Sequence, residues 1–348
     1  MIKAEERSLS IEEFLQCDLP LVDVRAPIEF NKGHIPGAQN IPLLTNDDRH
    51  RVGLCYRQKG HREAVKLGLT LVGPRMAELA QSGLDAADDR AIAVYCQRGG
   101  QRSQSMAWLW TQLGLTVYRL DGGYKSFRVW VTKTLNKPRE FLLLAGSTGV
   151  GKTEYLHNLL ESGESVIDLE GLAHHKGSAF GAIGERNAPT QGHFENKLAV
   201  ILSNIDQTDP IWMEAESRRI GTCQIPEAIW SSMEVATRIY VERDVSQRIE
   251  RLTHDYHSAS IAELERALHA IRKRLGPEAY KEALKDLHND NRSGVVSKVL
   301  GYYDRLYNKH KIRHKSRILA TIDVSMLSEE RVLCQLQSLK DEKYPQTE

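Results

Sequence analysis

Cys96 heads a loop whose residue types suit the binding of an anion and nucleophilic attack on it. A short apolar run, residues 91–95, precedes the cysteine, and Gln97-Arg98-Gly99-Gly100-Gln101-Arg102-Ser103 follows it before a helical pattern begins. The glycines let the backbone turn its N–H groups inward, and the helix start adds partial positive charge. A cysteine in such surroundings has a lowered pKa and reacts as a thiolate. The candidate catalytic residues are Cys96, Arg98 and Arg102, with the backbone of Gly99 and Gly100 as anion ligands. The alternative is a buried structural cysteine beside an ordinary Gly-Gly turn.

A second loop matches the pattern G-x-x-x-x-G-K-[ST] in full. It follows an apolar run, residues 141–145, and precedes a helical pattern over 154–160, which is the context that a phosphate-binding P-loop requires. Such a loop holds polyphosphate with its N–H groups, with its lysine on the outer oxygens, and its hydroxyl can ligate Mg²⁺. The motif specifies neighbouring phosphates but no base, and a glycine-rich turn without a ligand is the alternative. The candidate phosphate-binding residues are Gly146, Ser147, Thr148, Gly149, Gly151, Lys152 and Thr153.

Carboxylates follow two further strand candidates, residues 165–168 and 210–214. Asp168 and Glu170 lie at the end of the first, and Glu214 and Glu216 at the end of the second. They are candidates to bind Mg²⁺ or substrate, although neither pair has the form of a typical Walker B aspartate. Solvated charges at strand ends are the alternative. No metal site is assigned from the sequence, and no tightly bound cofactor is expected.

The elements that must position these loops alternate between strand and helix. Other strand candidates are residues 19–24, 237–241 and 317–322, and a helix over 102–113 is ended by Gly114. Alternating strands and helices predict an α/β fold with parallel sheets. A polar segment containing Pro138 separates two such units, so we expect one domain over residues 1–133, a linker over 134–140 and a second domain over 141–348.

Composition limits the class of protein. The chain has 348 residues, 41% hydrophobic and 27% charged, which suits a globular protein of two domains. Five widely spaced cysteines without a CxxC pair argue against a disulfide scaffold or structural zinc. Apolar runs stay well short of the ~18 residues that span a bilayer. The N-terminus carries acidic residues and has no apolar h-region, so it lacks a secretory pattern. We therefore expect a cytoplasmic protein without a membrane partner.

The balanced net charge of +1 conceals a basic C-terminal region. Residues 238–317 hold 18 Lys and Arg against 11 Asp and Glu. Its last part, residues 298–317, has seven basic residues and one acid, with Tyr302, Tyr303 and Tyr307 among them. Such a surface suits a nucleic-acid backbone, and tyrosines can stack on splayed bases. An ordinary solvated basic helix is the alternative. The residues expected to contact phosphates are Lys309, Lys311 and Arg313.

The first half of the chain resembles a rhodanese (sulfurtransferase) domain. The matching motifs are Asp23-Val24-Arg25, residues 33–38, and Gly122-Gly123-Tyr124, and the resemblance covers about residues 1–133. Arg102 lies one place further from the cysteine than in ordinary rhodanese loops. This C-x5-R spacing resembles that of phosphatases sharing the fold, and it favours a tetrahedral, phosphate-sized anion. A phosphate-like chalcogen donor is therefore expected in place of plain thiosulfate.

The whole chain, from about Leu9 to Leu339, resembles the tRNA 2-selenouridine synthase family. Besides both loops, matches include residues 53–60, 167–173, 191–196 and 214–220. The resemblance implies a transferase that converts 2-thiouridine at the tRNA wobble position to 2-selenouridine in two steps. The first is S-geranylation with geranyl diphosphate, and the second is selenation with selenophosphate through a Cys96 selanyl intermediate. It implies a 2-thiouridine-type tRNA as substrate, to which the basic residues Lys309, Lys311 and Arg313 are expected to bind. We also expect selenophosphate synthetase as a supplier of the donor, and a monomeric chain.

Other functions remain open at this point. One is an ATP- or GTP-dependent tRNA sulfurtransferase, and another is a regulatory P-loop kinase carrying a rhodanese domain. A phosphatase using Cys96 fits the C-x5-R spacing but lacks an obvious general acid in the loop. A non-catalytic RNA-binding module leaves both anion loops unexplained.

Overall fold

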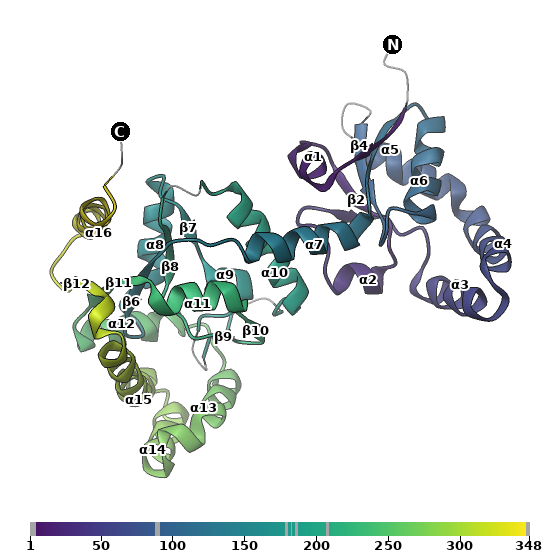
Figure 1. The fold of residues 1–348 in the computed structure, drawn as a ribbon. Coiled ribbons are helices and arrows are strands. Elements are labelled where there is room, and N and C mark those ends of the chain that lie inside the picture. The colour runs from purple at the N-terminus through teal and green to yellow at the C-terminus, as the bar shows by residue number, and fades with distance from the viewer. Residues whose placement is uncertain are drawn as a thin grey trace. The chain divides into compact units, whose positions relative to one another are not determined.

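The computed structural model describes residues 5–87, 91–177, 180–181, 183–184, 187–206 and 209–345. The chain divides into two compact units, the first formed by Met1–Leu135 with Glu195–Leu202 and the second by Asn136–Phe194 with Ser203–Glu348 (Figure 1). The expected division at residues 134–140 did not include the segment 195–202, because a helical pattern carries no signal of the unit on which it packs.

The first unit is built on a parallel sheet. Its strand order is β1 (Glu6–Leu9), β5 (Thr116–Leu120), β4 (Ala91–Tyr95), β2 (Leu21–Asp23) and β3 (Gln39–Asn40). Neighbouring strands pair in parallel throughout this order. Because β4 lies between β5 and β2, its carboxyl end opens at the middle of one edge of the sheet. That edge is where parallel α/β sheets bind ligands.

Helices cover this sheet and complete its core. They are α1 (Ile11–Gln16), α2 (Pro27–Asn31), α3 (Asn46–Lys59), α4 (His61–Val72), α5 (Met76–Ala86), α6 (Gln101–Gln112) and α7 (Gly123–Leu135). The core joins strand residues such as Val22 and Val94 to Leu79 and Trp110 from α5 and α6. The Trp110 indole also donates a hydrogen bond to the Leu79 carbonyl at 3.0 Å. This packing anchors α6, the helix that follows the cysteine loop.

The second unit has its own parallel sheet. The strand order is β12 (Ile318–Asp323), β11 (Thr237–Glu242), β6 (Phe141–Gly146), β8 (Ile211–Glu214) and β7 (Val166–Ile167). These pairs are again parallel. A separate antiparallel pair joins β9 (Arg219–Ile220) to β10 (Cys223–Gln224). Strand β6 is central and fully buried, and it runs directly into the P-loop.

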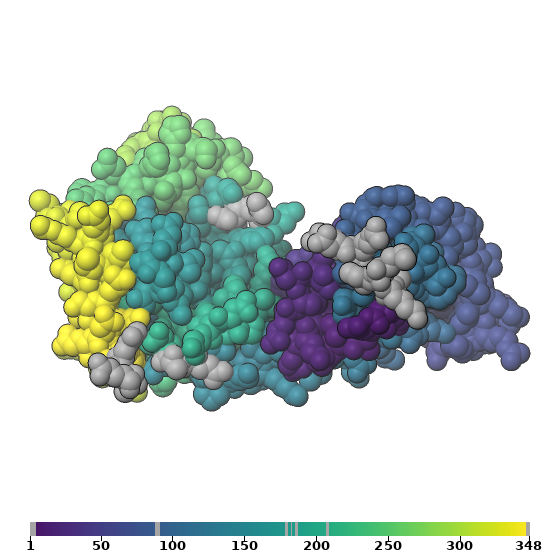
Figure 2. Space-filling view, turned by 90° about the horizontal axis from the view of Figure 1, so that it is seen from above, coloured from purple at the N-terminus to yellow at the C-terminus, as the bar shows by residue number. Residues whose placement is uncertain are grey.

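The helices of the second unit form two groups. Those around the sheet are α8 (Lys152–Glu161), α9 (Leu169–Ala173), α11 (Glu227–Val235) and α16 (Glu329–Lys343), whereas α10 (Gln191–Asn204) is divided between the units, because its residues 195–202 belong to the first. The others form a helical block, α12 (Val245–Asp255), α13 (Ile261–Leu275), α14 (Pro277–His288) and α15 (Arg292–Arg313). The block has a core of its own that includes Leu268, Ile271 and Ala283. Figure 2 shows it, in light green, as a continuous mass within the second unit.

The predicted α/β fold with parallel sheets is confirmed, as are the predicted strands before both loops. The predicted strand over residues 317–322 is β12, and the predicted helix over 102–113 is α6. Each of the five cysteines lies in the described part of the chain and is free. Among the described helices, none is both long and apolar enough to cross a membrane.

Candidate functional site

The Cys96 thiol lies at the carboxyl end of β4 and is buried. The Ser103 hydroxyl, in the first turn of α6, donates a hydrogen bond to the sulfur at 3.2 Å. Burial raises the pKa of Cys96, but hydrogen bonds from the Ser103 hydroxyl and from the backbone of Arg98 and Ser103 outweigh it. The charge of Arg102 acts in the same direction, so the pKa lies below its ordinary value. The surroundings therefore favour the thiolate, the nucleophilic form of cysteine.

The backbone of the cysteine loop is fixed by the first residues of α7. Gly99 has a φ of +63° and Gly123 a φ of +60°. A Cβ atom at Gly123 would lie 2.3 Å from the Cys96 carbonyl oxygen and 2.4 Å from the Gly99 nitrogen, so a side chain here would displace the loop. The Tyr124 N–H donates to the same Cys96 carbonyl at 2.8 Å. The Arg119 guanidinium donates to the Gly99 carbonyl at 3.0 Å.

The Asp23-Val24-Arg25 motif braces the loop from its other side. Arg25 Nη2 lies 2.6 Å from Asp23 Oδ2, and both side chains are almost completely buried. Arg25 also donates to the Gln97 amide oxygen at 3.2 Å, and its guanidinium lies 3.8 Å from the centre of the Tyr124 ring. This motif therefore positions the residue next to Cys96.

The two predicted arginines have different surroundings. Arg102 Nη1 lies 2.7 Å from Glu29 Oε2, and Arg49 Nε lies 3.3 Å from the same oxygen. Burial raises the pKa of Glu29, but the two guanidinium groups lower it by more, so Glu29 is held ionised. The charge of Arg102 is thus already matched by a carboxylate. Arg98, in contrast, is exposed.

The P-loop is curled by its glycines. Gly149 has a φ of +83° and Gly151 a φ of +99°. A Cβ atom at Gly146 would lie 2.4 Å from the Val241 carbonyl oxygen, so the loop begins in close contact with β11. Lys152 Nζ donates to the Gly146 carbonyl at 3.3 Å, which folds the side chain over the loop. The loop opens into a mixed polar pocket of about 1170 Å³.

Three carboxylates meet beside this loop within the described residues. Oxygen atoms of Glu170, Glu214 and Glu216 lie within 4.8 Å of one another. Glu214 ends β8, next to β6, and accepts a hydrogen bond from the Thr153 hydroxyl at 2.6 Å. Asp168 lines the same pocket but acts as the N-cap of α9, because its Oδ1 accepts the Gly171 N–H at 2.7 Å. The structure thus brings together three of the four predicted carboxylates.

Ionisable groups are concentrated in this cluster. Burial and the neighbouring carboxylates raise the pKa of Glu170, and burial raises that of Glu214. Burial lowers the pKa of Lys152, but Tyr307 and the carboxylates Glu214 and Glu216 raise it by more, so the ammonium stays charged. Clustered oxygen ligands beside a threonine hydroxyl are the donor set that Mg²⁺ prefers. The residues therefore fit a divalent cation.

The basic residues at the end of α15 are partly paired. Lys311 Nζ lies 2.5 Å from Glu242 Oε1, and Arg313 Nη2 lies 3.0 Å from Glu234 Oε2. Lys309 is exposed. The predicted basic stretch is therefore a helix end on which carboxylates from neighbouring elements offset part of the positive charge.

The tyrosines of this stretch point inward rather than to solvent. Tyr302 is only 8% exposed and belongs to the core of the helical block. Tyr303 packs against it with ring centres 5.1 Å apart. The Tyr307 ring lies 5.6 Å from Lys152 Nζ, and burial raises the pKa of Tyr307 to about 12. The expectation that Tyr302 stacks on a base is wrong, because α15 buries this side chain against α13 and α14.

Several residues that contact the two loops were not among the site residues predicted from the sequence. Ser103 could have been found from its position one turn into the helix after the loop. Glu29 and Tyr307 carry no local signal, because each reaches its loop from a distant part of the chain. Gly177 has a φ of +61°, and a Cβ atom there would lie 2.2 Å from Glu170 Oε1.

A buried thiol at the end of a parallel sheet and a complete P-loop on a second sheet define a rhodanese-like domain joined to a P-loop domain. The rhodanese-like domain family matches residues 10–129, and the tRNA 2-selenouridine synthase AAA domain family matches residues 139–332.

Relatives match along most of the chain. The tRNA 2-selenouridine synthase of Shewanella pealeana is 35% identical over 342 residues, covering 87% of this chain and 91% of the relative. That of Pseudomonas fluorescens is 36% identical over 342 residues, covering 86% and 90%. One solved structure is described as "Crystal structure of N-terminal domain of putative ATP/GTP binding protein from Clostridium difficile 630". It is 36% identical to this chain, the match covers 36% of this chain and 98% of that one, and the TM-score is 0.34. The chain belongs to the tRNA 2-selenouridine synthase family, and it is an enzyme of the transferase class.

Proposed function

We propose that this enzyme converts 2-thiouridine at the wobble position of tRNA to 2-selenouridine in two steps. The first transfers a geranyl group from geranyl diphosphate to the 2-thio sulfur, and the second replaces the geranylated sulfur with selenium from selenophosphate. The proposal rests on one combination of observations in a single chain. One loop holds a thiol with a lowered pKa, and a P-loop elsewhere in the chain contacts a buried carboxylate through its threonine. Each loop suits one of the two phosphorus-containing donors.

In the first step the tRNA sulfur attacks C1 of the geranyl group, and the C1–O bond breaks. The bonding electron pair leaves on the diphosphate, whose charge therefore rises in the transition state. Lys152, held charged by its neighbours, and the loop N–H groups offset this charge. Thr153 with Glu170, Glu214 and Glu216 would hold a Mg²⁺ ion, which supplies further charge neutralisation.

In the second step the Cys96 thiolate receives selenium. Attack of sulfur on selenium forms an S–Se bond and breaks the Se–P bond, and the electron pair leaves on phosphorus, which is thereby reduced and departs as phosphite. The terminal selenium then attacks C2 of the base and expels geranylthiolate, and a thiol reductant cleaves the S–Se bond to release 2-selenouridine. Alkylation comes first because an S-alkylated carbon loses its sulfur far more readily than a thiocarbonyl does. Arg102 and the N–H groups of Gly99 and Gly100 hold the phosphate of the donor.

Nucleoside analysis of cellular tRNA tests this function. A strain lacking the gene should contain 2-thiouridine but no 2-selenouridine, and the wild-type gene should restore the selenium nucleoside. With selenium withheld, S-geranyl-2-thiouridine should accumulate. Loss of 2-thiouridine itself in the deletion strain would instead indicate the sulfurtransferase alternative. Unchanged nucleosides together with nucleotide turnover by the purified chain would indicate the kinase alternative.

Removing the basic side chains at the end of α15 should weaken tRNA binding, because these side chains would neutralise backbone phosphates. We expect the triple variant Lys309→Ala, Lys311→Ala, Arg313→Ala to reduce the salt dependence of binding by up to ~0.9 log units for each phosphate that is no longer neutralised. Glu242→Gln is the matched control, because it releases Lys311 from its partner and should steepen the salt dependence. Filter binding over a salt series measures both. An unchanged slope in the triple variant would leave this helix end as an ordinary solvated surface.

A further inference from the structure

A wide pocket lies over one face of the sheet in the second unit. Alternate residues of β6 and β11 enter the core of this unit, and the residues between them face the other way. On that face Arg238 lies beside Leu143, and Tyr240 lies beside Ala145, and all four line the pocket. Parallel sheets normally cover both faces with apolar packing. An arginine and an open cavity on one face therefore indicate a binding surface.

The cations of this pocket are not matched by carboxylates alone. Arg238 is only 5% exposed, and its guanidinium donates to the backbone carbonyls of Met233 and Ala236, each at 2.9 Å. Arg274 of α13 and His310 of α15 also line the pocket and are exposed. Within the described residues, neither of these two side chains forms an ion pair or a hydrogen bond. The pocket therefore offers positive charge to a ligand from outside.

Two aromatic side chains of the pocket keep their polar ends free. Trp230 of α11 is half-buried, and Tyr240 is 6% exposed. Among the described residues, the Trp230 indole N–H and the Tyr240 hydroxyl have no hydrogen-bond partner. Nucleic-acid-binding proteins stack unpaired bases on aromatic rings and hold the strand with basic side chains. The volume of about 530 Å³ also lies in the ~300–1,000 Å³ range of ligand pockets. The lining thus suits a nucleotide.

The pocket is continuous with the phosphate pocket of the P-loop. His175 and Tyr307 line both cavities. Gly146, where the P-loop begins, and Glu216 of the carboxylate cluster line the nucleotide-sized pocket as well. A base held here would therefore have one edge directed at a ligand bound on the P-loop.

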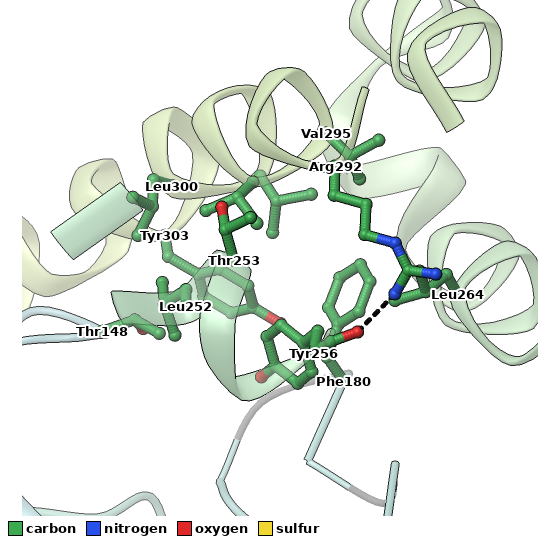
Figure 3. Close-up of a pocket in the computed structure, with 12 residues that line it drawn as sticks. Thr148, Phe180, Leu252, Thr253, Tyr256, Leu264, Arg292, Val295, Leu300 and Tyr303 are labelled. Atoms are coloured by element: carbon green, nitrogen blue, oxygen red, sulfur yellow. Dashed lines mark hydrogen bonds between the residues drawn. The ribbon is translucent and has the colours of Figure 1, made fainter. Parts of the chain in front are cut away.

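A further cavity beside the P-loop is too small for a base. It is enclosed by α12, α13 and α15 and has room for only about 30 Å³, enough for a few water molecules at most. Figure 3 shows Leu252, Tyr256 and Leu300 around this space. Arg292 Nη1 donates to the Tyr256 carbonyl at 2.6 Å, drawn there as a dashed line. Of these two cavities, only the pocket over β6 and β11 can hold a base.

We propose that this pocket receives the wobble nucleotide of the tRNA, turned out of its loop, with the base beside Trp230 and Tyr240 and a neighbouring phosphate at Arg274. The inference rests on the proposed function and assigns the acceptor of the first step to the face of β6 and β11. An enzyme that modifies a base takes it out of its stack and holds it in a pocket. Stacking should make a nucleotide with a base bind on the order of 10- to 100-fold more tightly than one without.

Binding of two anticodon stem-loop RNAs to the full-length chain tests this pocket. One RNA carries 2-thiouridine at the wobble position, and the other carries an abasic nucleotide there. Wild type should prefer the first on the order of 10- to 100-fold. Trp230→Ala should lose most of this preference, with binding of the abasic RNA and of inorganic diphosphate unchanged, which misfolding cannot mimic. Trp230→Phe keeps a ring and should retain the preference, as should the control Trp108→Ala at an exposed position of the first unit.

A second variant tests the phosphate contact without disturbing any packing. Arg274→Ala should weaken binding of both RNAs equally and reduce the salt dependence by up to ~0.7–0.9 log units. Lys273→Ala, at the neighbouring exposed position of α13, is the matched control and should bind as wild type.

Two results would contradict the pocket and leave the proposed function standing, provided that tRNA geranylation is intact. One is a wild-type base preference in Trp230→Ala, and the other is Arg274→Ala binding as Lys273→Ala does. A wild-type chain that neither distinguishes the two RNAs nor geranylates tRNA would overturn both the pocket and the proposed function.

Discussion

Replacing Cys96 with serine should abolish selenium transfer while geranylation of tRNA continues at the wild-type rate. Serine keeps the size of the side chain but has no accessible anionic form at neutral pH, and it cannot form the S–Se bond. The measurement is single-turnover selenation of pre-geranylated tRNA, run beside geranylation of 2-thiouridine tRNA with the same protein. Selenouridine formation by Cys96→Ser at the wild-type rate would remove the thiolate from the mechanism.

Cys223→Ser is the matched control, because Cys223 is also buried but its pKa is raised by burial. This variant should selenate normally, as should serine variants of the remaining cysteines. The pH dependence adds a second readout. Because Ser103 helps to lower the pKa of Cys96, Ser103→Ala should move the acidic limb of the selenation profile to higher pH. A profile identical to wild type would mean that the rate does not depend on this thiolate.

Replacing Lys152 with alanine should slow geranylation by about 10²–10³-fold, the usual effect of losing one donor to a developing charge. Selenation of pre-geranylated tRNA should remain largely intact, because that step uses the other loop. Single-turnover geranylation by wild type and Lys152→Ala, with and without ATP, measures this. Lys281→Ala, an exposed position on α14, is the matched control and should behave as wild type.

The same experiment separates the donor-binding role from a nucleotide cycle. If the P-loop binds the diphosphate of the prenyl donor, ATP should neither be required nor be hydrolysed during transfer. Obligatory ATP hydrolysis would contradict this role and support a nucleotide-driven switch. Normal geranylation by Lys152→Ala would equally exclude the P-loop from the transfer step.

The strands that lead into the two loops could be predicted from sequence because each is a short, fully apolar run between polar turns. Residues 91–95 and 141–145 show this pattern, and both are central strands of parallel sheets. β1 could not be predicted in the same way. It is a mostly polar edge strand, Glu6–Leu9, and it forms because β5 offers hydrogen-bonding partners.

The candidate sites were predictable as far as they are continuous in sequence. Both loops are single segments whose spacing reflects backbone geometry. The partners from elsewhere were not predictable, because their approach depends on the folded sheet. Glu29 reaches Arg102 from α2, and Tyr307 reaches Lys152 from α15. Asp168 and Glu170 have similar sequence contexts, yet one caps a helix and the other joins the carboxylate cluster.

Because Gly123 lies so close to the cysteine loop, a substitution at this position should have a different effect from loss of the whole gene. The three atoms nearest to a side chain at this position belong to Cys96, Arg98 and Gly99, all in the first unit. Under the proposed function, such a missense allele would keep the first activity and lose the second. Its phenotype would differ from that of a null allele, because the cell would carry lipid-modified tRNA that it cannot process further. Under that function, partial damage to this gene would therefore leave a different nucleoside in tRNA from the one that its complete loss leaves.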